Sequence, residues 1–138
     1  MGDSARIMTF KQIQRLIKNG ELLSLRSELD RGLSPNLSNQ FSWSLLMLAA
    51  IEGNTAIGEL LISRGAELDA KNKFGETALS LAAHGGHTHF IQVLLANGAS
   101  TDCQPHGHNL NDWIRITSGL PQDKIASILN LINKARVG

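Results

Sequence analysis

Five histidines and one cysteine lie close together in the second half of the chain, and they are the residues with the most evident chemistry. They are His84, His87, His89, Cys103, His106 and His108. Zinc and copper favour imidazole and thiolate ligands, so this cluster is a candidate for a metal or redox sensor. Cys103 beside His106 could also be an activated thiol, although no third residue is evident to orient that pair.

We interpret the histidine cluster as structural. His106 and His108 alternate along a loop, where alternate side chains need not converge on one ion. A single cysteine cannot form an internal disulfide, which favours a reducing compartment. We therefore expect no cofactor, no bound metal and an inert, half-buried Cys103, in a protein of the cytoplasm with possible access to the nucleus.

Motifs of other chemistries are absent from the sequence. It contains no phosphate-binding glycine loop, nucleophile elbow, zinc-protease motif or paired metal-binding cysteines, and it has no tyrosine. Catalysis requires several groups that converge in a pocket. We predict that the protein is not an enzyme.

Composition and charge narrow the possible partners. The 138 residues are 42% apolar and 18% charged, which fits one soluble domain over residues 1–138. Thirteen basic and twelve acidic residues leave a formal charge of +1, which argues against bulk attraction to nucleic acid or to anionic membranes. The longest apolar run, residues 45–51, is too short to span a bilayer.

The middle of the chain repeats itself after 33 residues. The coincident pairs are Ser44 with Thr77, Leu46 with Leu79, Ala49-Ala50 with Ala82-Ala83, Gly53 with Gly86, Leu61 with Leu94 and Gly65-Ala66 with Gly98-Ala99. Glycines and small residues do not align this consistently by chance, so the sequence predicts a repeat architecture.

Each unit has the pattern of two helices joined by a tight turn. Thr77 is a good N-cap, and Leu79, Ala82 and Ala83 follow it on one helical face. Gly86 ends this helix, and a second helix with Phe90, Ile91, Leu94 and Leu95 on its buried side ends at Gly98. The alanines allow neighbouring units to approach closely.

The two ends of the chain diverge from the repeat, as the caps of a solenoid must. Thr9 is predicted to cap a helix through Lys18, and Gly20 to begin a turn to a second helix ending near Gly32. At the other end Trp113 and Ile114 replace Leu81 and Ala82. Pro121 then opens a last helix with Ile125, Ile128, Leu129 and Ile132, after a link about two residues longer than the repeat requires. The predicted units are 9–38, 39–71, 72–104 and 105–137.

Residues 75–87 and 93–99 resemble the ankyrin repeat, and residues 48–54 and 60–66 match it nearly as well. The family's Thr-Pro-Leu-His tetrapeptide is degraded in both units, to residues 44–47 and 77–80. The resemblance implies an all-α ankyrin-repeat solenoid of about four repeats, including two divergent caps. It also implies that His87 stands at the structural Gly-His turn of the family.

The resemblance also implies a function, which is binding another protein on the concave face. That face comprises the inter-repeat loops and the first helix of each pair. The corresponding positions are Lys18, Asn19, Gln40, Phe41, Trp43, Ile51, Glu52, Lys71, Lys73, Phe74, Glu76, His84, Gln104 and His106. We expect a monomeric adaptor or stoichiometric inhibitor that binds neither nucleic acid nor membrane. An immunity protein that neutralises a toxin enzyme is an alternative.

Three of the six aromatic residues fall in these loops. Phe41, Trp43, Ile51 and Phe74 are predicted to form an apolar centre, with Phe41 and Phe74 stacked on neighbouring loops. The rim would consist of Glu52, Lys71, Lys73 and Glu76, with the lysines favouring an acidic partner. The alternative is that Trp43 packs back against Phe10 or Phe74 and only seals the loops.

The expectation of no metal has a direct test. Chelation by EDTA should leave the melting temperature of the purified protein unchanged, because only a ligand bound to the native state stabilises it by mass action. The measurement is thermal unfolding followed by circular dichroism with and without chelator. A large drop in melting temperature would restore the histidine cluster as a metal site.

Overall fold

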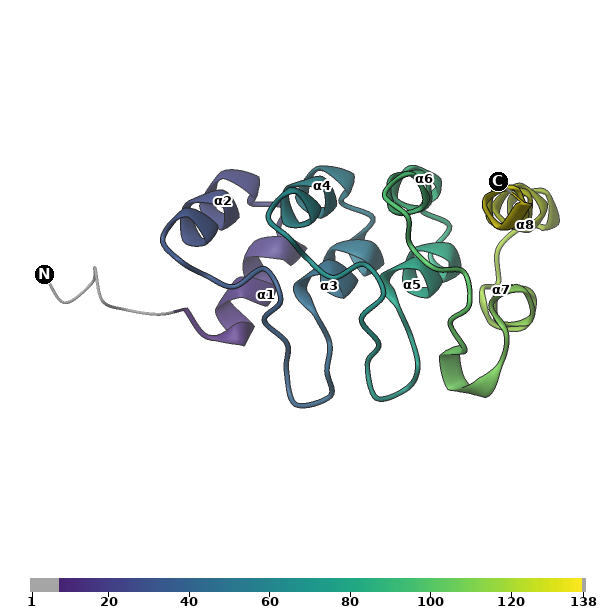
Figure 1. Ribbon diagram of the computed structural model, residues 1–138, viewed down its shortest axis with the longest axis horizontal. Coiled ribbons are helices and arrows are strands. Elements are labelled where there is room, and N and C mark those ends of the chain that lie inside the picture. The colour runs from purple at the N-terminus through teal and green to yellow at the C-terminus, as the bar shows by residue number, and fades with distance from the viewer. Residues whose placement is uncertain (1–7, 138) are drawn as a thin grey trace, which may run out of the picture.

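A computed structural model describes residues 8–137, and these residues fold into four pairs of helices that follow one another in a row (Figure 1). The helices are α1 (Phe10–Lys18), α2 (Leu22–Asp30), α3 (Leu45–Glu52), α4 (Thr55–Ser63), α5 (Ala78–His84), α6 (Thr88–Ala96), α7 (Leu110–Thr117) and α8 (Gln122–Val137). The predicted all-α repeat solenoid is confirmed. None of the helices in residues 8–137 is long and apolar enough to cross a membrane.

The pairs stack so that the molecule has two layers of helices. The inner helices α1, α3, α5 and α7 pack in order against one another, and the outer helices α2, α4, α6 and α8 form the second layer. Three loops extend away from the outer helices (Figure 1). We call them finger 1 (residues 38–44), finger 2 (71–77) and finger 3 (104–109).

The four inner helices begin alike. Thr9, Ser44, Thr77 and Asn109 are the N-caps, and each side-chain oxygen accepts a hydrogen bond from the backbone amide three residues later. Such caps satisfy one of the amides that a helix leaves unpaired at its start. Because Ser44, Thr77 and Asn109 each end a finger, this bond fixes where those three fingers end and the helices begin.

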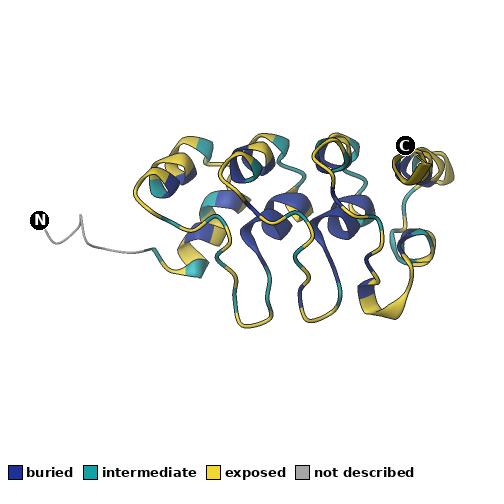
Figure 2. Ribbon diagram, in the orientation of Figure 1, coloured by how far each residue is buried: buried dark blue, intermediate teal, exposed yellow. Residues whose placement is uncertain are grey.

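Small side chains are buried on the two central inner helices, α3 and α5. Ala49 and Ala50 on α3, and Ala82 and Ala83 on α5, are fully buried, and Figure 2 shows most of both helices dark blue. The leucines at matching positions of the two central repeats are buried as well. Leu46, Leu61, Leu79 and Leu94 are each at most 1% exposed.

The last pair keeps the stack in spite of its altered spacing. Ile114 is fully buried on α7, and the inward side of α8 consists of Ile125, Ile128, Leu129 and Ile132, as predicted. Thr77 and Asn109, the N-caps of α5 and α7, are 32 residues apart. Ile91 and Ile125, which are buried at matching places on α6 and α8, are 34 residues apart. The two extra residues therefore lie in the link between α7 and α8.

Truncation of one buried leucine should measure how much the stack depends on its core. We expect Leu79→Ala to lower the free energy of unfolding by about 2–5 kcal/mol, because it leaves a cavity between α5 and its neighbours. Leu23→Ala is the matched control, since Leu23 is 75% exposed on α2, and it should change the free energy by about 0.5 kcal/mol or less. Urea unfolding measures both, and a cost below about 1 kcal/mol for Leu79→Ala would contradict the predicted register.

Candidate functional site

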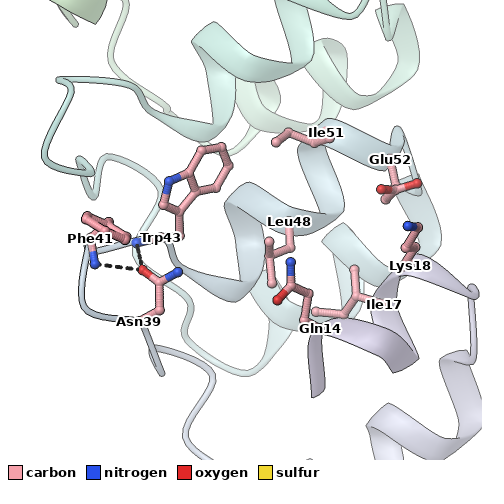
Figure 3. A pocket seen from close by; sticks show the side chains of 9 residues that line it. All are labelled: Gln14, Ile17, Lys18, Asn39, Phe41, Trp43, Leu48, Ile51 and Glu52. Atoms are coloured by element: carbon pink, nitrogen blue, oxygen red, sulfur yellow. Dashed lines mark hydrogen bonds between the residues drawn. The ribbon is translucent and has the colours of Figure 1, made fainter. Parts of the chain in front are cut away.

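An apolar groove of about 290 Å³ lies on the face formed by the inner helices and the fingers. It is bounded by α1, α3 and finger 1 (Figure 3). Its lining residues are Gln14, Ile17, Lys18, Asn39, Phe41, Trp43, Leu48, Ile51 and Glu52. This concave, largely apolar shape with a few polar groups at its edge is the usual form of a binding site.

Two helices contribute to the groove with the same spacing. On α1, Ile17 and Lys18 follow Gln14 by three and four positions. On α3, Ile51 and Glu52 follow Leu48 by the same two intervals. Residues with this spacing lie on one side of a helix. Ile17 and Leu48 are buried and form the floor, whereas Ile51 on the rim is 41% exposed.

Finger 1 forms the third wall through its aromatic residues. The side-chain oxygen of Asn39 accepts hydrogen bonds from the backbone amides of Phe41, at 2.9 Å, and Trp43, at 3.0 Å. Ser42 between them has a φ of 64°, which tightens the tip of the finger. These bonds fix the backbone of finger 1 beside the groove. There the Phe41 side chain is 46% exposed and the Trp43 side chain is half-buried.

The other end of the same face is filled by the protein's own rings. His106 stacks on Phe74 with ring centroids 5.5 Å apart, and on Trp113 at 4.9 Å. His84 lies 5.8 Å from Trp113, and its Nδ1 is 3.1 Å from the hydroxyl of Thr117. These distances are those of favourable aromatic pairs. We call Phe74, His84, His106 and Trp113 the aromatic cluster.

Repeat equivalence explains why the two ends of the face differ. Trp113 on α7 occupies the position that Leu48 holds on α3 and Leu81 on α5. A tryptophan is much larger than a leucine, so its ring reaches His106 of finger 3. At the first two helix pairs Leu48 leaves the corresponding space open, and the groove lies there.

The fingers are also joined to one another by their backbones. The amide of Lys73 donates to the carbonyl of Phe41 at 3.0 Å, and that of His106 donates to the carbonyl of Phe74 at 2.7 Å. Within the described chain no ring contact joins Phe41 to Phe74, so the predicted stacking of these two rings is wrong. Phe74 is engaged instead by the next finger, through His106.

Glu76 departs from its predicted place on the rim. It is only 8% exposed, because one carboxylate oxygen accepts from the side-chain amide of Asn72 at 2.8 Å. The other oxygen lies 3.3 Å from Nε2 of His106. Lys71 is exposed, but it lines a separate small hollow with Asp69 and Asp102. Neither residue therefore flanks the groove.

The structure brings together part of the predicted set. Lys18, Phe41, Trp43, Ile51 and Glu52 line the groove, while Phe74, His84 and His106 belong to the aromatic cluster. Asn19, Gln40, Lys73 and Gln104 are exposed outside both groups. The sequence analysis missed Gln14, Ile17, Asn39 and Leu48 in the groove. Helical spacing was the signal that could have found two of them, because Gln14 lies four positions before Lys18 and Leu48 lies three positions before Ile51.

The histidines and Cys103 do not form a metal centre in the part of the chain that the structure describes, since no three potential ligands converge there. His87 bonds to the backbone carbonyl of Ile51 through Nε2 at 3.0 Å, so it links α3 to the next turn. Cys103 is more deeply buried than expected, at 3% exposure. Burial raises the pKa of its thiol, and the nearby Thr77 hydroxyl opposes this effect. The nucleophilic thiolate is thus disfavoured.

Comparison with known proteins adds one finding. A family model for ankyrin repeats, in three copies, matches residues 11–109. These residues include α1 after its first residue, α2 to α6, all three fingers and every residue that lines the groove. A search of curated proteins found no match.

Proposed function

The chain belongs to the ankyrin-repeat family, whose members are generally protein-protein interaction modules, and from this premise we propose that it binds a partner protein in the groove between α1, α3 and finger 1. The binding is non-catalytic. A module of this kind acts by covering or holding part of its partner, as a stoichiometric inhibitor or an adaptor.

The observation that carries the proposal is the pair of exposed apolar side chains at the groove. Phe41 on finger 1 and Ile51 on α3 are 46% and 41% exposed, and both line one apolar hollow. Burying such side chains releases free energy in proportion to the area removed from water. Large apolar residues at the centre of an interface commonly supply most of its binding energy.

The polar groups around the hollow support the same proposal. Lys18 and Glu52 lie at the end of the groove where α1 and α3 finish, and Gln14 and Asn39 place amide groups beside the apolar floor (Figure 3). Charged and amide groups at the rim of an apolar centre provide specificity and orientation. This arrangement is typical of protein recognition.

Removing either apolar wall should weaken binding without unfolding the protein. We expect Phe41→Ala and Ile51→Ala each to weaken the binding of short peptides, selected on the wild-type protein from a phage-displayed library, by about 1–2 kcal/mol. Fluorescence anisotropy measures the affinity, and thermal unfolding checks the fold. Leu23→Ala is the control, because it removes an apolar side chain that is even more exposed, on the outer helix α2.

The contrary outcomes are specific. Peptides that lose affinity for the Leu23 variant but not for the groove variants would place the binding surface on the outer helices. The groove variants could instead be unstable, with their folded fraction binding the peptides as tightly as the wild type. That result would mean that Phe41 and Ile51 serve packing and not binding.

A further inference from the structure

Fingers 1 and 2 have the same backbone fold but differ at one matched position. In finger 2, Asn72 accepts from the amides two and four residues later, at 2.9 and 3.0 Å, as Asn39 does in finger 1 at the same two distances. The residue four positions after the asparagine is Glu76 in finger 2 and Trp43 in finger 1. This difference determines what the asparagine can still bind.

In finger 2 the asparagine side chain is fully engaged, because its Nδ2 donates to the Glu76 carboxylate at 2.8 Å. Trp43 has no acceptor oxygen in its side chain. Among residues 8–137 the Nδ2 group of Asn39 consequently has no partner, and Figure 3 shows it turned toward the groove. A half-buried amide donor gains by pairing with an acceptor from a bound molecule.

The size of the groove sets the size of what it can hold. An engineered apolar cavity of about 150 Å³ is enough to bind benzene. The groove, at about 290 Å³, therefore has room for one large apolar side chain. The buried floor of Ile17 and Leu48 would contact the end of that side chain, and the Phe41 and Trp43 rings would contact its flank.

A donor beside an apolar hollow indicates the conformation of the bound segment. In a helix the backbone carbonyls are bonded to amides four residues later, and few are free to accept. In an extended segment they remain free, and successive side chains point to opposite sides. One side chain can then enter the groove while a neighbouring carbonyl accepts from Asn39.

Charge around the groove favours an acidic segment. Lys73 is exposed, its backbone amide is bonded to Phe41, and within the described residues it forms no ion pair. At the opposite end Lys18 and Glu52 carry opposite charges and no net charge. Lys73 lies outside the lining of the groove, but its backbone bond to Phe41 places it next to finger 1, so its positive charge would attract an acidic side chain to the finger end of the groove.

We propose that the groove binds an extended, acidic segment of another protein. One large apolar side chain fills the hollow, a backbone carbonyl accepts a hydrogen bond from Asn39 Nδ2, and a carboxylate faces Lys73. This rests on the proposed function, since it specifies the partner of the same groove. Trp43 is the residue that creates the site, because it both lines the hollow and leaves the Asn39 donor free.

Two substitutions test this proposal on the folded protein. Trp43→Glu gives finger 1 the residue that finger 2 has, so the new carboxylate should accept from Asn39 and close the site. Asn39→Asp keeps an oxygen that accepts from the Phe41 and Trp43 amides but removes the donor and adds a negative charge. We expect each to weaken the selected peptides by about tenfold or more. Asn133→Asp on α8, in the last helix pair, is the matched control for binding, because Asn133 is exposed and the aspartate keeps an oxygen that accepts from Arg136 while adding the same charge. It should leave the affinity within about twofold.

The peptides themselves provide a second readout. Phage-displayed linear peptides selected on the wild-type protein should be enriched in one large apolar residue with an aspartate or glutamate nearby. Their affinity should fall with added salt, and Lys73→Gln should remove most of that dependence. If Trp43→Glu fails to fold, as judged by circular dichroism, Asn39→Asp alone decides the outcome.

Different failures have different meanings. Peptides that bind the Asn39 and Trp43 variants normally but lose affinity for Phe41→Ala would overturn this proposal and leave the proposed function standing. Basic or uncharged consensus peptides would overturn the acidic partner. Two outcomes would overturn the proposed function together with this inference. Either the affinity of the selected peptides is also unchanged by Phe41→Ala and Ile51→Ala, or the selection yields no specific peptide.

Discussion

The close approach of the inner helices is the constraint on which the stack depends. Ala49 and Ala50 of α3 face a core in which Ala82 and Ala83 of α5 are equally buried. A larger side chain at any of these positions would push the pairs apart, because a packed interior has no space to take it up. The spacing of the inner helices in turn sets the spacing of the fingers. Backbone bonds such as Lys73 N–H to the Phe41 carbonyl can form only at that distance.

Variation between repeats gives this regular scaffold a specific surface. Fingers 1 and 2 share an asparagine that organises the backbone, yet Trp43 and Glu76 use it differently. The inner helices share their caps, yet Trp113 fills the space that Leu48 leaves open. The groove lies where Trp43 and Leu48 favour an apolar hollow. The aromatic cluster lies where Glu76 and Trp113 favour contacts within the protein, and it holds finger 3 against α7 and finger 2.

The fold could be predicted from the sequence because its signals are local and repeated. Caps such as Thr77, glycine turns and buried leucines recur at a fixed interval, and each acts within its own helix pair or on the next one. The site was less predictable because it depends on contacts between different fingers. Nothing near Glu76 in the sequence indicates that its carboxylate lies between Asn72 and His106. Trp113 reaches His106 because its ring is larger than the leucine of the other repeats, and the sequence does not indicate that finger 3 places His106 within that reach.

The central claim is that partners are bound by the groove and not by the aromatic cluster or the outer helices. The most direct measurement is an NMR titration of the ¹⁵N-labelled full chain with the tightest peptide from the phage selection. The account predicts amide shift changes concentrated in residues 14–18, 39–43 and 48–52, with an added downfield shift of the Asn39 side-chain amide as it donates a hydrogen bond. Shift changes confined to α2, α4 and α6, or centred on His84 and Trp113 with the Asn39 amide unmoved, would contradict it.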